Sequence, residues 1–256
     1  MPHPRGQYIP LSLARRMIGD FLHYGQRIPL AHGEQRFDLS DLKAAVAKAR
    51  PRPSWQAIFF KAWAIVAAER PVLRRIYVGR PWARLYEHPV NIGAIVVSRP
   101  LEGDQALHHL PIHVPEQATL VELDRKFTHA RLAPVAEIPA FRRQILQARL
   151  PFPLRRAIYD LGMNWMGRWK AKHLGTFGMS CVASLGGATL TTIAPWTTMI
   201  HYTPFAPDGS LMMRVALDHR VLDGVEASIA FHELRRTLDG PIMDEVVSLR
   251  RAAAAA

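Results

Sequence analysis

Cysteine is nearly absent from this chain of 256 residues, since Cys181 is the only one. A single cysteine excludes an internal disulfide and is typical of a reducing compartment. The N-terminal residues MPHPRGQYIPLSLARR lack the apolar core of a secretory signal peptide. No internal repeat and no clear linker divide the sequence. We therefore expect one cytoplasmic domain spanning 1–256, with 246–256 as a flexible tail.

Charged side chains are absent from 173–207, a stretch long enough to cross a bilayer if it were one helix. Its glycines, its prolines and its many Ser and Thr residues instead favour buried strands joined by turns. No contact with a membrane is therefore expected. Apolar residues make up 49% of the chain, which is enough to bury a sizeable core.

Acidic residues are few compared with basic ones: 21 Asp and Glu face 33 Lys and Arg, for a net charge of +12. A basic surface attracts anions such as nucleic acids, anionic lipids, phosphorylated cofactors or acidic proteins. An ordinary solvated surface rich in Lys and Arg explains the same composition. The arginine pairs are scattered, and only 165–170 interleaves basic and aromatic residues. Nucleic-acid binding is therefore the last of the hypotheses, and no nucleic acid is expected as a partner.

The order of predicted elements favours an α+β body with a mixed sheet. Apolar periodicity predicts helices at 11–25, 40–50, 54–69, 119–131 and 225–238, with Ser12 and Ser54 as N-caps and Thr119 as the start of the fourth helix. Runs rich in β-branched residues predict strands at 86–98, 111–114, 177–182, 188–193, 197–202 and 211–217. The segment 133–172 reads as broken helices, and the Pro-Asp-Gly at 207–209 predicts a hairpin turn.

The string Asp-His-Arg-Val-Leu-Asp-Gly at 218–224 lies between a predicted strand and a predicted helix. Catalytic groups are frequently held on short loops of this kind. The spacing of His219, Asp223 and Gly224 alone is weak, because a surface histidine beside a helix-capping aspartate also satisfies it. The longer string is more specific.

This longer string resembles the active-site signature of the 2-oxo acid dehydrogenase acyltransferases, the dihydrolipoamide acyltransferase components. Their catalytic domain shares its fold with chloramphenicol acetyltransferase. Further segments are similar to the family in the same order: RRMIG at 15–19, Ile28-Pro29, HPVNIGAIVV at 88–97, LPIHVPEQATLVELDRKF at 110–127 and GTFGMSCVASLGG at 175–187. The resemblance implies a chloramphenicol acetyltransferase-like two-layer sandwich, in which helices pack on a mixed sheet.

The resemblance also implies acyl transfer between coenzyme A, or another acyl-thioester carrier, and a thiol or hydroxyl acceptor. His219 matches the general base of the family, whose other ring nitrogen is held by a backbone carbonyl. Ser180 matches the hydroxyl that stabilises the oxyanion, and Ser184 is the less favoured substitute. A serine that simply bonds to a neighbouring strand is the alternative for Ser180.

Asp223 matches a family aspartate that fixes the active-site loop by pairing with an arginine of the first helix. Arg15 is the best match for that arginine and Arg16 is the second choice. The resemblance further implies a homotrimer, in which the histidine and the serine of each site come from adjacent subunits. Coenzyme A carries phosphates, which suits the basic balance of charge.

The chain also departs from the family. No lipoyl domain, covalently attached lipoate or subunit-binding domain is expected, so a lipoyl or acyl-carrier protein would be a separate partner. The segment 133–173 is unlike the family and lies just before Ser180, so we expect it to reshape the acyl pocket. A catalytically silent structural or regulatory trimer associated with a 2-oxo acid dehydrogenase-type complex is the alternative function. No metal is expected, because His108, His109 and His113 lack the spacing of a zinc site and read as surface histidines.

Overall fold

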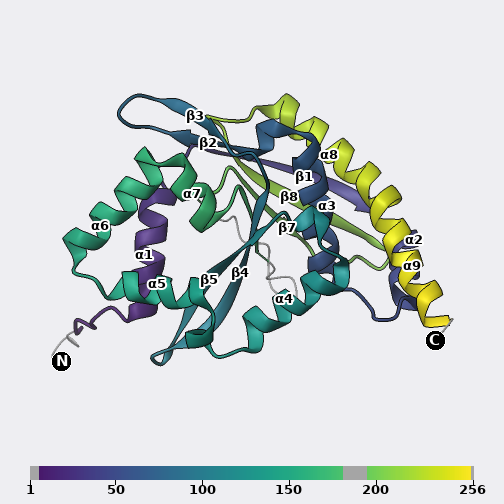
Figure 1. Ribbon diagram of the computed structural model, residues 1–256, viewed down its shortest axis with the longest axis horizontal. Helices are drawn as coiled ribbons and strands as arrows, with labels where there is room; N and C mark the ends of the chain where they lie inside the picture. Colours follow the sequence, from purple (N-terminus) through teal and green to yellow (C-terminus); the bar gives the residue numbers. More distant parts are fainter. Residues whose placement is uncertain (1–5, 181–194, 255–256) are drawn as a thin grey trace, which may run out of the picture.

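A six-stranded mixed sheet forms the centre of the computed structural model, which describes residues 6–180 and 195–254 (Figure 1). The strands follow the order β1-β8-β7-β6-β4-β5 across the sheet. The short β6 runs parallel to β4 and β7, and the other neighbouring strands are antiparallel. The strands are β1 (Leu30–Asp38), β4 (Ile92–Leu101), β5 (Asp104–His113), β6 (Phe177–Ser180), β7 (Thr198–Tyr202) and β8 (Ser210–Asp218). A separate hairpin pairs β2 (Arg75–Val78) with β3 (Arg84–Glu87).

Helices surround this sheet on several sides (Figure 1). The α-helices are α1 (Leu13–Gly25), α2 (Ser40–Lys48), α3 (Trp55–Glu69), α4 (Leu120–Leu132), α5 (Pro139–Arg149), α6 (Phe152–Asp160), α7 (Gly167–Leu174), α8 (Gly224–Thr237) and α9 (Met243–Ala254). Two π-helical turns, η4 (Leu161–Trp165) and η6 (Leu238–Ile242), lead into α7 and α9. Among the described helices, none combines the length and the apolar character that crossing a membrane requires.

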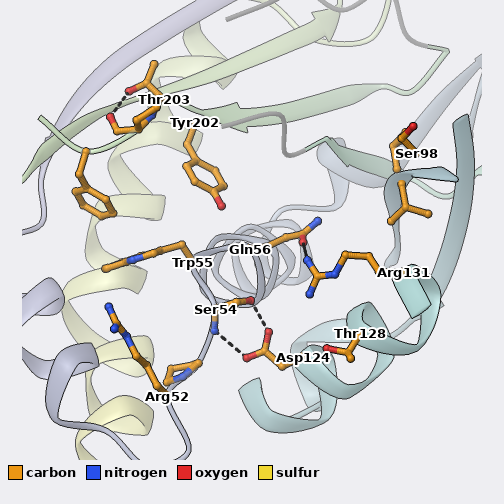
Figure 2. Close-up of a pocket in the computed structure, with 15 residues that line it drawn as sticks. Arg52, Ser54, Trp55, Gln56, Ser98, Asp124, Thr128, Arg131, Tyr202 and Thr203 are labelled. Carbon is orange, nitrogen blue, oxygen red and sulfur yellow. Dashed lines mark hydrogen bonds between the residues drawn. The ribbon is translucent and has the colours of Figure 1, made fainter. Parts of the chain in front are cut away.

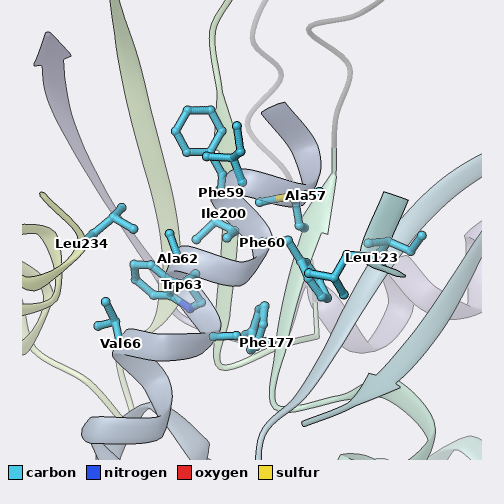
Figure 3. Close-up of a cluster of buried hydrophobic side chains, with 14 of the residues drawn as sticks. Ala57, Phe59, Phe60, Ala62, Trp63, Val66, Leu123, Phe177, Ile200 and Leu234 are labelled. Atoms are coloured by element: carbon cyan, nitrogen blue, oxygen red, sulfur yellow. The ribbon is translucent and has the colours of Figure 1, made fainter. Parts of the chain in front are cut away.

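The main hydrophobic core lies between the sheet and α3, α4 and α8 (Figure 3). Helix α3 supplies Phe60 and Trp63, which are almost completely inaccessible to solvent. Phe60 contacts Phe127 of α4 edge to face and lies beside Phe177 of β6. These three phenylalanine rings therefore link the helical layer to the centre of the sheet. Burial of such side chains contributes roughly 1.5–3 kcal/mol each.

A smaller cluster packs on the opposite side of the same strands. Ala94, Met199 and Ala216 from β4, β7 and β8 meet Tyr24 of α1 and Leu174 of α7. The α+β fold class, with a mixed sheet and packed helices, is confirmed. This second cluster places the segment 151–174 beside the end of β8, where the predicted active-site loop begins.

Local signals predicted the helix starts accurately. Ser12 and Ser54 cap α1 and α3 by accepting hydrogen bonds from backbone N–H groups. Thr119 and Glu122 form a reciprocal capping box at α4. The Pro-Asp-Gly turn is also confirmed, with Gly209 at a φ of 84°, where a side chain would be strained. The broken helices expected at 133–172 are α5, α6, η4 and α7.

Several predicted boundaries were wrong. The expected strand at 86–98 is interrupted, since β3 ends at Glu87 and β4 begins at Ile92. The expected short strand at 111–114 is the end of the ten-residue β5, which pairs along its whole length with β4. Strand β1 was not predicted. The expected strand at 188–193 lies outside the described residues.

The C-terminal segment 246–256 was expected to be a flexible tail, but its residues up to Ala254 continue helix α9. Val246 is completely buried and belongs to the main core. Glu245 forms an ion pair with Lys61 of α3 and accepts a hydrogen bond from the Leu120 N–H, at 2.7 Å. These contacts with α3 and α4 explain why the helix is ordered, and they depend on residues far away in the sequence.

Candidate functional site

The loop between β8 and α8 carries His219 and is tightly turned. The N–H groups of Val221 and Leu222 both donate to the carbonyl of Asp218, at 2.9 and 3.1 Å. The backbone N–H of His219 donates to the carbonyl of Pro29, at 2.9 Å, just before β1. Backbone hydrogen bonds from the same chain therefore fix the position of His219.

The imidazole of His219 is held by a backbone carbonyl, as the resemblance implied. Its Nδ1 lies 2.9 Å from the carbonyl oxygen of Leu222. Because a carbonyl only accepts hydrogen bonds, Nδ1 carries the hydrogen, and Nε2 of the neutral ring is the acceptor. The His219 residue is exposed. The hydrogen bond to Leu222 thus orients the ring and leaves Nε2 as a proton acceptor on an exposed residue.

Asp223 and Arg15 do not form the ion pair that the resemblance implied. The Asp223 carboxylate caps α8, accepting from the N–H groups of Val225 and Glu226 at 2.9 and 3.0 Å. Arg15 pairs instead with Asp104 at the start of β5, at 3.1 Å. The first turn of α1 lies against β5, so Asp104 is the nearer carboxylate for Arg15. Arg16 makes no ion pair with any residue in the described ranges.

An ion pair that was not predicted from the sequence stabilises the His219 loop. Arg220 binds the Asp218 carboxylate with two hydrogen bonds, of 2.8 Å from Nε and 2.7 Å from Nη2. Its guanidinium also lies 4.1 Å from the ring centroid of Tyr77 on β2. The Asp218 side chain is 2% exposed. The alternation of Asp and Arg around His219 was the available signal, but it did not reveal the burial.

Lys170 of α7 lies near this ion pair and was not predicted from the sequence either. It is only 4% exposed. Burial lowers the pKa of the Lys170 ammonium to about 8; Asp218 opposes this shift and Arg220 adds to it. Lys170 falls in the segment that departs from the resembling family, so no motif could have identified it.

Ser180 and His219 lie towards opposite ends of the sheet within one chain. Phe177 of β6 pairs with Thr198 of β7, which pairs with Leu217 of β8. Ser180 lies three residues beyond Phe177, and His219 lies two residues beyond Leu217 in the opposite direction. At about 3.3 Å per residue, the five residues between them correspond to roughly 16 Å along the strands alone. They therefore cannot act on the same atom within one chain.

A cavity of about 830 Å³ lies near the Ser180 end of the sheet (Figure 2). Val96 of β4, which pairs with Ser180, is among its lining residues. Figure 2 shows Trp55 and Gln56 at the start of α3, with Tyr202 from β7 on one side and Arg131 from α4 on the other. Arg131 donates to Gln56 at 3.1 Å. Aromatic and polar groups thus share this cavity. Cys181 and Ser184 lie outside the described residues.

Of the three histidines expected at the surface, His113 is exposed, His109 is half-buried and His108 is buried. His108 was expected at the surface, but it is completely buried, stacked on Phe141 at 4.7 Å and bonded to Gln144 at 3.2 Å. Burial lowers the pKa of His109 to about 3, and it lies near Trp196. Within residues 6–180 and 195–254, no three His, Cys, Asp or Glu side chains are grouped to hold a metal. The expected absence of a metal stays a prediction.

The arrangement of strands and helices defines the class of fold, which is that of dihydrolipoamide acetyltransferase catalytic cores. No family profile and no curated sequence matches the chain. A probable dihydrolipoamide acetyltransferase from Listeria monocytogenes is 18% identical, with a TM-score of 0.64 over 91% of this chain and 94% of that one. The corresponding Azotobacter vinelandii enzyme is 17% identical, with a TM-score of 0.66 over 93% of both chains.

A third solved structure agrees with these two. It is a truncated catalytic core of the 2-oxoacid dehydrogenase multienzyme complex from Thermoplasma acidophilum. That core is 17% identical, with a TM-score of 0.65 over 92% of this chain and 99% of the other. At this level of identity the likeness establishes the fold, and the chemistry has to be argued from the site itself.

Proposed function

We propose that this chain is an acyltransferase that moves an acyl group between coenzyme A, or another acyl-thioester carrier, and a thiol or hydroxyl acceptor. The observation that carries the proposal is the orientation of His219. Its Nδ1–H is bound to the Leu222 carbonyl, which leaves Nε2 as a proton acceptor at an exposed strand-end loop. General bases are recognised by this kind of fixed and accessible geometry.

The chemistry follows from the acidity of the attacking group. A thiol of pKa about 8.5 is only slightly ionised at neutral pH, so a base that removes its proton raises the rate. In the proposed reaction, His219 Nε2 takes this proton as the sulfur attacks the thioester carbonyl. The resulting oxyanion accepts a hydrogen bond from the Ser180 hydroxyl. The proton then returns to the departing thiolate, so the acyl group is transferred without net oxidation.

One of the solved structures has site residues that can be compared with those of this chain. The work on the Azotobacter vinelandii enzyme concerned the catalytic roles of a serine, a histidine and an asparagine. The asparagine in that enzyme follows the histidine by four positions, which is the spacing between His219 and Asp223 here. In this chain the residue four positions after the histidine is Asp223, whose carboxylate caps α8.

The separation of Ser180 and His219 supports a site shared between copies of the chain, and the homotrimer that we propose is the assembly that the resemblance implies. The two groups lie at opposite ends of the sheet, so a complete site requires the Ser180 end of a second copy to face the His219 loop of the first. Closed rings of identical subunits repeat such a heterologous contact once per subunit. A lipoyl or acyl-carrier protein would be a separate partner, and we place the enzyme in the cytoplasm.

Turnover assays test the proposal directly. The full chain is incubated with acetyl-, propionyl- and longer acyl-coenzyme A together with dihydrolipoamide, and release of free coenzyme A is followed. Replacing His219→Ala is expected to lower kcat by about 10²–10⁴-fold, the usual contribution of a general base. The matched control is His232→Ala, which removes an exposed histidine from α8 and is expected to retain full turnover.

Two results would contradict the proposal. Equal turnover of the His219→Ala and His232→Ala variants would exclude His219 as the base. A folded wild-type protein without turnover on any donor would favour the catalytically silent structural or regulatory trimer.

A further inference from the structure

A small cavity lies beside the His219 loop, between α1, β2, η4 and α7. Its volume is about 30 Å³, and its polar lining consists of Tyr24, Arg27, Tyr77, Asn164, Lys170 and Arg220. One water molecule needs roughly 10–15 Å³ on this measure, so the cavity admits a group the size of a carboxylate but not a bulky phosphate ester. Arg220 directly follows His219 in the sequence.

The charges around this cavity are not balanced. Arg27, Lys170 and Arg220 line it, and no acidic side chain of the described residues does, although Asp218 attracts the Lys170 ammonium. Both oxygens of Asp218 are already bound by Arg220. Within the described part of the chain, the Lys170 ammonium makes no hydrogen bond and no ion pair within 4.0 Å. A cation that is nine-tenths buried without a partner is costly unless a ligand supplies the opposite charge.

Arg220 also keeps donors available. Its Nε and Nη2 bind Asp218, and its Nη1 donates to no acceptor among the residues that the structure describes. The Tyr77 ring packs against its guanidinium and holds the plane in place. Lys170 and Arg220 together therefore present fixed, unused N–H groups to one small space.

We propose that this cavity binds a carboxylate of the substrate, with the Lys170 ammonium and the Arg220 Nη1 as donors. The inference rests on the proposed function, because it assigns the cavity to the reaction carried out at the neighbouring His219. The carboxylate belongs either to the far end of the acyl chain or to the acceptor. Charge-assisted hydrogen bonds of this kind are about twice as strong as neutral ones.

A larger cavity offers a route into this site. It has a volume of about 520 Å³ and shares Tyr24 and Arg27 with the smaller one. Arg156 and Asp160 also line it, and Arg156 is ion-paired with Asp20. The shared Tyr24 and Arg27 place the two cavities side by side.

Binding measurements on an inert parent test the inference separately from catalysis. Succinyl- and butyryl-coenzyme A differ in a terminal carboxylate, and calorimetry on the His219→Ala protein compares their affinities. We expect succinyl-coenzyme A to bind at least about 10-fold more tightly, since hydrogen bonds to charged groups contribute more than neutral ones. A second comparison uses dihydrolipoate against dihydrolipoamide, which places the carboxylate on the acceptor.

The variant Lys170→Met is expected to abolish whichever preference is found. Lys172→Met removes an exposed lysine from the same helix and is expected to retain that preference. The preference of the parent is measured without any change at Lys170, so poor folding of one variant leaves the test intact. No preference for a carboxylate in either comparison would overturn the inference while leaving the proposed acyl transfer standing. A preference without wild-type turnover would contradict the proposed function alone.

Discussion

The two ends of the central sheet differ in how completely one chain builds them. At one end, His219 is fixed by the carbonyls of Pro29 and Leu222, and the Asp218–Arg220 pair stabilises its loop. At the other end, Ser180 is half-buried near a cavity of about 830 Å³. One end therefore holds a fixed imidazole, whereas the other end has a half-buried hydroxyl near a large cavity. Under the proposed function, a second copy of the chain joins the two.

The largest loss of stability is expected from a substitution that breaks the Asp218–Arg220 ion pair beside His219. In an Asp218→Ala variant, Arg220 loses its buried partner, and breaking such a pair typically costs 3–5 kcal/mol of unfolding free energy. Turnover should fall with it, because the loop that carries His219 loses its support. Urea unfolding and steady-state kinetics measure both effects.

The matched control for this variant is Glu34→Gln, which breaks an exposed ion pair between Glu34 on β1 and Arg214 on β8. Exposed pairs contribute about 0–1 kcal/mol, so this variant should resemble the wild type. Similar losses in the two variants would contradict the special role of the buried pair.

Lys170 is expected to reduce stability in a manner that depends on pH. Its folded-state pKa of about 8 lies below its ordinary 10.5, so the unfolded chain binds more protons between these values. The penalty is complete below pH 8 and disappears as the pH rises towards 10.5. Lys170→Met should therefore raise the unfolding free energy at pH 7 by up to about 3 kcal/mol. The gain should shrink above pH 8.

Thermal unfolding of wild type and Lys170→Met between pH 7 and 10 measures this difference. The groups that face Lys170 include Asp218, Arg220 and Arg27. Lys170 should account for most of the change in stability with pH in this range. The difference in stability between wild type and the Lys172→Met control should therefore not depend on pH. A constant difference across the range would contradict the lowered pKa.

A smaller effect should separate two roles of Asp223. Asp223→Ala removes the cap of α8 and should cost about 1 kcal/mol of unfolding free energy. Asp223→Asn keeps a side-chain oxygen that accepts from the same N–H groups, so its stability and turnover should stay close to those of the wild type. Strong loss of turnover in Asp223→Asn would show that the charge itself is needed, as in a catalytic triad.

The sequence predicted those features that depend on neighbouring residues. The caps at Ser12, Ser54 and Thr119 were recognisable because a helix start is decided within one turn. The His219 loop was recognisable for the same reason, since one short string contains both the histidine and the α8 cap. The placement of His219 between β8 and α8 was therefore correct from the sequence alone.

Features that depend on distant residues were missed or wrong. The pairing of Arg15 with Asp104 joins α1 to β5, and no sequence pattern favours it over Asp223. Helix α9 is ordered by contacts with α3 and α4, so its alanine-rich end resembled a tail. Lys170 approaches Asp218 only because α7 packs against η4 and β2, which are far from Asp218 in the sequence. Tertiary packing decides these contacts, and the local propensities of the residues do not predict them.

Mixing two inactive variants tests the central claim most directly. His219→Ala and Ser180→Ala proteins, each nearly inactive, are unfolded together in equal amounts and refolded. If each site joins the His219 of one chain to the Ser180 of the next, random assembly should restore about one quarter of the wild-type turnover. Activity that stays at the level of the separate variants, in a mixture that has demonstrably exchanged subunits, would contradict a site shared between chains.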